Sequence, residues 1–352
     1  MTQSHWKNAV RGAALSLVIV LLASCGDSPD TLVRSAHEYM AKGESNAALI
    51  QLRNALKKSP NNAEARYLLG TLLSDRRDPA GAVKELRTAL QLGYPADQIL
   101  PALARALIDD GSAKDLVAEF GNETLANADA QAAFKTIIGN ALMELGKPKE
   151  AEAAFATALA AKPDYAGAQL GIATLRAKER KLAEAKQIVD GVVSRPNAPP
   201  EAFMLQAELL FAAGQQDAAR AVLQKLSETK PAYLPAHYRL AALMIAGGEF
   251  DQASGEIAAI RKVSKQDIRA YYLDTLIASA RGDLAAAREA VQQVLRAWPH
   301  NAPALLLAGE IEYRSKAYTQ AEDYLRQSLA AAPGLAYAET MLAATYLRVG
   351  SP

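Results

Sequence analysis

The chain has 352 residues, of which 50% are hydrophobic and 22% are charged, and 39 Lys and Arg against 38 Asp and Glu leave a formal net charge of +1. This balance gives no reason to expect nucleic acid as a partner, because neutralising phosphates requires clustered basic residues. The low aromatic content of 6% and the abundance of Ala and Leu favour helices over sheets. The single cysteine, Cys25, excludes disulfides within the chain, Cys-based zinc sites and iron–sulfur clusters.

The N-terminus has the pattern of a processed leader. Lys7 and Arg11 form a basic start, and the apolar run over residues 13–22 is about half as long as a membrane-spanning helix requires. The run ends in Leu-Ala-Ser-Cys at residues 22–25, which resembles the bacterial lipobox. That resemblance implies cleavage before Cys25 and acylation of this residue, which would anchor the chain in a membrane. The alternative is an ordinary secretory leader with an incidental cysteine.

The residue after Cys25 indicates where such an anchor would go. It is Gly26, whereas Asp at this place in similar lipoproteins often signals retention in the inner membrane. We therefore expect a signal peptide over residues 1–24, then a lipidated Cys25 with a short tether over residues 25–30, on the outer membrane and facing the periplasm. Acylation of the thiol would leave Cys25 unavailable as a catalytic nucleophile.

A small residue recurs along the rest of the chain at intervals of 34 residues, with one interval of 35. Such a period indicates stacked structural repeats. A second series of mostly small residues follows twelve positions behind the first, which predicts two closely crossing antiparallel helices in each repeat. The first series is Ala36, Gly70, Ala104, Gly139, Ala173, Ala207, Ala241, Thr275, Gly309 and Ala343. The second series is Ala48, Ala82, Leu116, Ala151, Ala185, Ala219, Ala253, Ala287 and Ala321.

Turn and stop signals recur with the same period. Glycine seven residues after the first small position suits the left-handed conformation that ends a helix. A bulky apolar residue four positions after the second small residue is expected to fill the space between repeats, and prolines end the second helices at a common phase. The glycines are Gly43, Gly111, Gly146, Gly214, Gly248, Gly282 and Gly350. The bulky residues are Leu52, Leu86, Phe120, Phe155, Val189, Leu223, Ile257, Val291 and Leu325, and the prolines are Pro60, Pro163, Pro231, Pro299 and Pro333.

This combined pattern resembles the tetratricopeptide repeat (TPR). The fourth repeat carries it in Gly139, Ala151, Phe155, Ala158 and Pro163. The resemblance implies an all-α fold, a right-handed superhelical solenoid of about nine and a half helix-turn-helix repeats over residues 31–352. The third repeat has Leu116 in place of Ala and a one-residue insertion, so we expect its second helix to be short or irregular.

The tenth repeat is incomplete, because the chain stops after its first helix. Met341, Leu342, Tyr346 and Leu347 would then form an apolar face with no second helix to cover it, whereas solenoid ends usually carry a polar cap. Either the final helix is an imperfect cap, or the chain is shorter than the protein from which it derives. We favour the second explanation.

First helices line a concave groove in a TPR solenoid, so the resemblance also identifies candidate binding residues. Aromatic, Met and Leu side chains on a groove floor offer a large contact area to a peptide at low entropic cost. The alternative is that these side chains only pack against adjacent helices. The candidates for a partner-binding groove are Tyr67, Met204, Phe211, Tyr238, Tyr272, Leu306 and Tyr313.

The sequence shows no catalytic or metal-binding pattern. The four histidines have no metal-ligand spacing, and no Gly-rich phosphate loop or nucleophile motif occurs. We therefore expect no enzymatic activity, no cofactor and no metal. The expected partners are proteins or peptides in the groove and a membrane through the N-terminal lipid, without nucleic acid.

The N-terminal third resembles a narrower group, the TPR-repeat lipoproteins of the PEP-CTERM/exosortase system. The resemblance rests on the lipobox and on the runs over residues 47–56, 61–66, 92–94 and 100–107. It implies a lipid-anchored periplasmic scaffold that binds partner proteins of an envelope export system, or of exopolysaccharide production and surface-protein sorting. The alternative is a structural lipoprotein subunit of an outer-membrane protein or pilus assembly complex.

Overall fold

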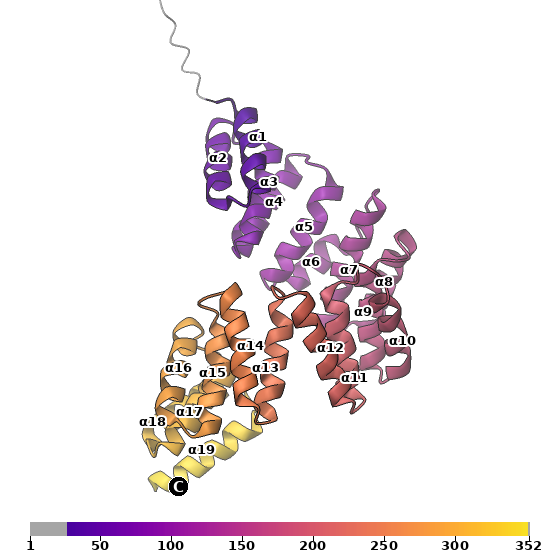
Figure 1. The fold of residues 1–352 in the computed structure, drawn as a ribbon. Helices are drawn as coiled ribbons and strands as arrows, with labels where there is room; N and C mark the ends of the chain where they lie inside the picture. Colours follow the sequence, from indigo (N-terminus) through magenta and orange to yellow (C-terminus); the bar gives the residue numbers. More distant parts are fainter. Residues whose placement is uncertain (1–26, 351–352) are drawn as a thin grey trace, which may run out of the picture. The chain divides into compact units, whose positions relative to one another are not determined.

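The computed structural model describes residues 27–350, which form nineteen helices and no strand (Figure 1). The predicted all-α fold of repeated helix pairs is confirmed. Contacts divide the chain into two compact units with their boundary between residues 147 and 148. The predicted signal peptide over residues 1–24 and Cys25 lie outside the described residues. None of the helices within residues 27–350 combines the length and apolar character that a bilayer span requires.

Unit 1 contains three helix pairs and the first helix of the fourth repeat. Short turns join the two helices of each pair, which pack side by side (Figure 1). Proline opens α4, and Asn side chains cap α3 and α7 by accepting hydrogen bonds from backbone N–H groups of the first turn. The helices are α1 (Pro29–Ala41), α2 (Ser45–Lys58), α3 (Ala63–Asp75), α4 (Pro79–Gln91), α5 (Ala96–Asp109), α6 (Ala113–Phe120) and α7 (Ala128–Glu144).

Unit 2 begins with the second helix of the fourth repeat and continues through complete helix pairs. It ends with α19, the first helix of the tenth repeat. Odd-numbered helices are the first helices of their repeats, and even-numbered helices are the second. The helices are α8 (Pro148–Ala161), α9 (Ala166–Lys178), α10 (Leu182–Val193), α11 (Pro200–Ala212), α12 (Gln216–Thr229), α13 (Leu234–Ala246), α14 (Phe250–Val263), α15 (Ile268–Arg281), α16 (Leu284–Ala297), α17 (Ala302–Arg314), α18 (Tyr318–Ala331) and α19 (Ala336–Val349).

Small residues let the two helices of a pair approach closely. A Cβ atom added to Gly70 on α3 would lie 2.6 Å from Cγ of Leu86 on α4. The same relationship recurs in unit 2, where a Cβ atom added to Gly309 on α17 would lie 2.7 Å from Cγ of Leu325 on α18. Both leucines are fully buried. The 34-residue series of small residues therefore marks the crossing points of the helix pairs.

The turn between the helices of a pair requires a left-handed backbone conformation. Six pairs place glycine there, with φ between +70° and +81°, as the sequence predicts, and Gly350 at the end of α19 has φ +75°. In the other three pairs a basic residue occupies the same position, and φ is +60° at Arg77, +62° at Arg180 and +63° at Lys316. A side chain in this conformation costs roughly 1 kcal/mol because its Cβ atom crowds the following carbonyl oxygen.

The third repeat has a shortened second helix. Helix α6 has 8 residues, whereas the other second helices have 12 to 14. Phe120, expected to fill the space between repeats, is instead half-buried at the last position of α6. The guanidinium carbon of Arg87 lies 5.8 Å from the centre of its ring. Because α6 ends at Phe120, no further turn of this helix covers the ring.

Helix α19 ends the described part of unit 2 and has no second helix packed on it. Of the four side chains expected to be uncovered, Leu347 is 85% exposed, and Met341, Leu342 and Tyr346 are half-buried. The hydroxyl of Tyr346 is a hydrogen-bond partner of Nε of Arg326 at 3.1 Å. At this end of the helix, Leu347 and Val349, which is 43% exposed, are the large apolar side chains that remain exposed.

Candidate partner-binding surface

All seven candidate groove residues lie on first helices, and every one is half-buried. Half-burial leaves part of each side chain accessible while its remainder packs against the protein. Tyr67 belongs to unit 1, and the other six belong to unit 2. We call these six the first-helix row: Met204 and Phe211 on α11, Tyr238 on α13, Tyr272 on α15, and Leu306 and Tyr313 on α17.

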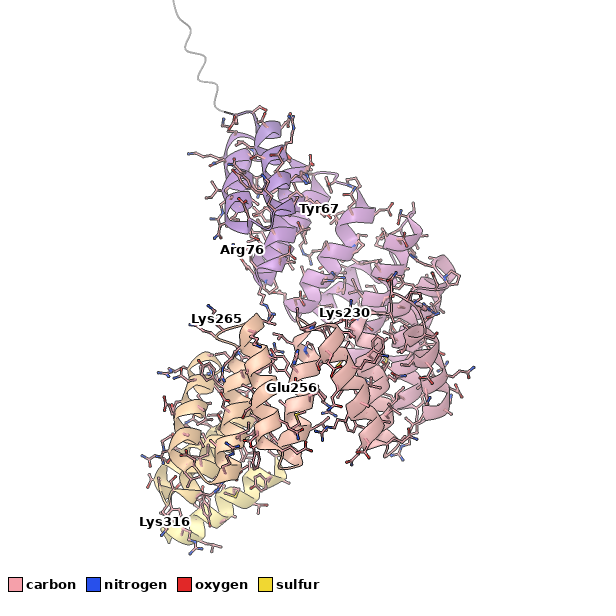
Figure 2. All side chains as sticks on the ribbon, in the orientation of Figure 1. Tyr67, Arg76, Lys230, Glu256, Lys265 and Lys316 are labelled. Atoms are coloured by element: carbon pink, nitrogen blue, oxygen red, sulfur yellow. The ribbon has the colours of Figure 1, made fainter. Side chains whose placement is uncertain are left out.

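Tyr67 in unit 1 stacks against a second tyrosine. Its ring centre lies 4.7 Å from that of Tyr94 in the loop after α4, and the ring planes differ by 21° (Figure 2 labels Tyr67). The hydroxyl of Tyr94 donates to Oε1 of Gln98 at 3.1 Å. Burial raises the pKa of the Tyr67 phenol. The two stacked rings form a small aromatic patch that the sequence pattern does not reveal, because Tyr94 lies outside the first helices.

Met204 and Phe211 contact one apolar cluster at the start of the first-helix row. Both side chains pack against buried residues that include Leu223 on α12 and Leu240 on α13. The guanidinium carbon of Arg239 lies 5.1 Å from the centre of the Phe211 ring. Arg239 belongs to the next first helix, so a cation from one repeat covers an aromatic ring of the preceding repeat.

Tyr238 is fixed by two residues from the following repeat. Its hydroxyl donates a 2.7 Å hydrogen bond to Oδ2 of Asp267, and the guanidinium carbon of Arg269 lies 3.9 Å from its ring centre. Burial, with the hydrogen bond to Asp267, raises the pKa of the Tyr238 phenol. Burial opposes ionisation of Asp267, but the hydrogen bond from Tyr238 and the charge of Arg269 outweigh it and lower its pKa. The hydroxyl of Tyr238 is therefore already hydrogen-bonded within the chain.

Tyr272 differs from Tyr238 in the contacts that its hydroxyl group makes. The ring packs against a buried cluster that includes Val294 and Leu305, and burial raises the pKa of the phenol. Within residues 27–350 its hydroxyl makes no hydrogen bond. A polar group on a half-buried side chain without an internal partner is suited to a contact with another molecule.

Leu306 and Tyr313 complete the row two helical turns apart on α17. The Tyr313 ring lies 5.6 Å from that of Tyr318 on α18, with the planes at 64°. A hydrogen bond between Arg348 and the Tyr313 side chain raises the pKa of the Arg348 guanidinium. Leu306 adds a half-buried apolar side chain to the row.

A set of polar contacts at the repeat junctions is not apparent from the sequence. In three repeats, a polar side chain of the first helix forms a hydrogen bond with the carbonyl oxygen of a proline six residues earlier in the chain. This proline follows the second helix of the preceding repeat. Arg66 donates to Pro60 at 3.0 and 3.1 Å, and Gln169 donates to Pro163 at 3.0 Å. His237 contacts Pro231 through Nε2 at 3.0 Å. The fixed spacing of six residues is the signal that could have identified them.

Two of these side chains also contact a glutamate on the second helix of their own repeat. Arg66 donates to Glu85 at 2.6 Å, and Nδ1 of His237 lies 2.6 Å from Oε2 of Glu256 (Figure 2 labels Glu256). Because a carbonyl oxygen only accepts, Nε2 of His237 must carry a proton. The His237 side chain is only 6% exposed. We interpret this histidine as a structural residue that ties two repeats together.

Chemically, the surface offers contact area from half-buried aromatic and apolar side chains with arginines beside two of the rings. Among residues 27–350, no group of three His, Cys, Asp or Glu side chains has an arrangement suited to holding a metal ion. Stacked helix pairs with a row of half-buried side chains define a helical-repeat protein of the protein-interaction class. Proteins of this class are generally non-enzymatic scaffolds.

The chain belongs to the tetratricopeptide-repeat proteins. Models of the tetratricopeptide repeat match residues 142–209, 210–277 and 276–336, and a TPR repeat model matches residues 36–74. Together these segments span more than half of the chain. No match was found among curated protein sequences.

Solved structures with a similar fold include two bacterial proteins. The Pseudomonas aeruginosa pilF structure is 21% identical over 58% of this chain and 92% of its own length, with a TM-score of 0.47. A tetratricopeptide repeat protein from Parabacteroides merdae is 16% identical over 91% of this chain and 99% of its own length, with a TM-score of 0.46.

Proposed function

We propose that the chain is a lipid-anchored periplasmic scaffold whose first-helix row binds partner proteins of an envelope export system, or of exopolysaccharide production and surface-protein sorting. The observation that carries the binding role is the series of half-buried aromatic and apolar side chains on α11, α13, α15 and α17. Such side chains supply most of the energy of protein interfaces when a partner excludes water from them.

The proposed mechanism is recruitment. Acylated Cys25 holds the chain at the membrane, and the row selects partners by the shape of its apolar surface. The guanidinium carbon of Arg239 lies 5.1 Å from the centre of the Phe211 ring, so this arginine adds positive charge beside the apolar contacts. Arg269, over the Tyr238 ring at 3.9 Å, is already paired with Asp267. A partner segment that combines apolar side chains with carboxylates or backbone carbonyls would satisfy both features.

Cell fractionation tests the anchor. Changing Cys25 to Ser is expected to release the chain from the membrane fraction or to block removal of residues 1–24, so leader processing is scored by mass beside location. A Cys25→Ser chain that is processed and still sediments with membranes would contradict acylation at this residue.

Co-purification from envelope fractions tests the scaffold role. Combined Tyr272→Ala and Leu306→Ala changes are expected to reduce recovery of the partner at least tenfold, whereas Glu289→Ala, at an exposed position on α16, leaves it unchanged. Recovery of exosortase or exopolysaccharide proteins supports the proposed system. Recovery of outer-membrane protein or pilus assembly components instead would assign the chain to the alternative role.

A further inference from the structure

Unit 2 contains a cavity of about 500 Å³ away from the first-helix row. One wall is the loop over residues 194–199 with the first turn of α11, and the other is the last turns of α12. Sites for small molecules in proteins usually measure about 300 to 1,000 Å³. The cavity is therefore large enough to hold a ring-sized molecule.

Three cations and no carboxylate line this cavity. Arg195 comes from the loop, and Lys225 and Lys230 come from α12 and its C-terminal cap (Figure 2 labels Lys230). None of the lining residues is Asp or Glu, although the chain as a whole contains nearly equal numbers of acidic and basic residues. Like charges gathered in one concave site attract an anion.

Arg195 is held in place without being neutralised. Its Nη1 donates to the main-chain oxygen of Asp164 at 2.7 Å, and its Nη2 donates to Oε1 of Gln169 at 2.5 Å. Both acceptors are uncharged, so they orient the guanidinium without forming an ion pair with it. Within residues 27–350, neither Lys225 nor Lys230 takes part in an ion pair.

The nearest acidic residues along the chain do not line the cavity. Burial raises the pKa of Tyr233, and the charge of Glu201 on α11 and its hydrogen bond to this tyrosine raise it further. Glu228 on α12 is exposed and is absent from the lining. The three cations therefore line the cavity with no carboxylate among the other lining residues.

Apolar side chains make up much of the remaining wall. Phe203 and Leu226 lie in the lining with prolines of the loop, among them Pro196 and Pro199. Flat apolar faces pack against the C–H groups of a ring while the cations bind its charged substituent. Asn197 also lines the cavity and offers an amide for a hydroxyl group.

We propose that this cavity binds a ring-sized ligand that carries a carboxylate or a phosphate. The inference does not depend on the first-helix row, because none of its residues lines the cavity. Arg195 and the two lysines would bind the oxyanion, and Phe203 with the prolines would contact the ring. Lys225 and Lys230 are exposed, so the site is open to a ligand from solution.

Calorimetric titration of the full chain with glucuronate, glucose 6-phosphate and glucose tests this proposal and separates a carboxylate from a phosphate ligand. At least one charged probe is expected to bind tenfold more tightly than glucose, and raised salt should weaken it. Combined Lys225→Gln and Lys230→Gln changes are expected to weaken that binding at least tenfold.

The control is Lys265→Gln, which removes an exposed lysine just after α14 that does not line the cavity (Figure 2). It is expected to leave the affinity unchanged. The proposal is overturned if neither charged probe binds more tightly than glucose, or if the double variant binds as tightly as the unmodified chain.

Discussion

Tyr238 on α13 donates a 2.7 Å hydrogen bond to Asp267, the residue that caps α15. The second oxygen of this carboxylate accepts from the backbone N–H of Arg269 at 2.9 Å. One aspartate thus orients a tyrosine of the first-helix row and begins the first helix of the next repeat. The side chains of the row are placed by neighbouring repeats, as expected where each repeat contacts only its neighbours.

Asp267 makes stability depend on pH in the acid range. The pKa of Asp267 is lower in the folded chain than in the unfolded chain. The carboxylate therefore stabilises the fold above about pH 4, where an unfolded aspartate is ionised. This contribution to stability is lost as the pH falls through the pKa that Asp267 has in the folded chain. Asp267→Asn should therefore lower the free energy of unfolding at pH 7, and the difference from the unmodified chain should shrink below pH 4. Urea unfolding across this range measures it.

The control for Asp267 is Asp251→Asn. The Asp251 side chain is 98% exposed in its pair with Arg281, so this change should have little effect at any pH. An Asp267 difference that grows as the pH falls would contradict the account.

His237 is expected to contribute to stability through its two buried contacts. His237→Leu would leave Glu256 and the Pro231 carbonyl without their hydrogen-bond partner, which should lower the free energy of unfolding by about 2 kcal/mol. His37→Leu is the matched control, because His37 and its partner Glu64 are 52% and 48% exposed. The control should cost less than about 0.5 kcal/mol. Equal losses in the two variants, measured by chemical denaturation, would show that the buried contacts do not matter.

Two helical glycines of unit 2 should respond to the same substitution with opposite signs. Gly255→Ala on α14 meets no atom within 4 Å and should stabilise the chain by up to about 1 kcal/mol through helix propensity. Gly309→Ala places a Cβ atom 2.7 Å from Leu325, and overpacking should outweigh the propensity gain and lower the free energy of unfolding by about 1 kcal/mol. A gain at Gly309 as large as that at Gly255 would mean that this crossing is not closely packed.

The left-handed turns predict a simple stabilising change. Lys316→Gly removes the crowding of a side chain at φ +63° and should raise the free energy of unfolding by about 0.5 to 1 kcal/mol. The reverse change, Gly214→Ala at φ +75°, should lower it by about 1 kcal/mol. Denaturation midpoints that move in the opposite directions would contradict this explanation of the turns.

The repeat fold could be predicted because helix crossings need small residues at fixed places. The series that includes Gly70 and Gly309 reports this geometry directly, since a Cβ atom at either position would meet a buried leucine. The lone prolines likewise predict where second helices end: α12 ends at Thr229, two residues before Pro231.

The contacts of individual surface residues could not be predicted in the same way. The phase of the repeat places Tyr238 and Tyr272 on the same kind of helix position, but only Tyr238 meets an aspartate, which comes from 29 residues further along the chain. The sequence does not reveal the contacts at the repeat junctions, because the three residues that make them, Arg66, Gln169 and His237, are of three different types. Only the folded turn brings their donors to a proline carbonyl.

Site-specific photocrosslinking in cells tests the central claim most directly. A photoreactive phenylalanine analogue replaces Tyr272 on the first-helix row or, as a control, Glu289 on the second helix of the same repeat. We expect Tyr272 to yield a crosslinked partner in envelope fractions and Glu289 to yield none of that species. Crosslinking of the same partner from Glu289, with none from Tyr272, would contradict binding through the first-helix row.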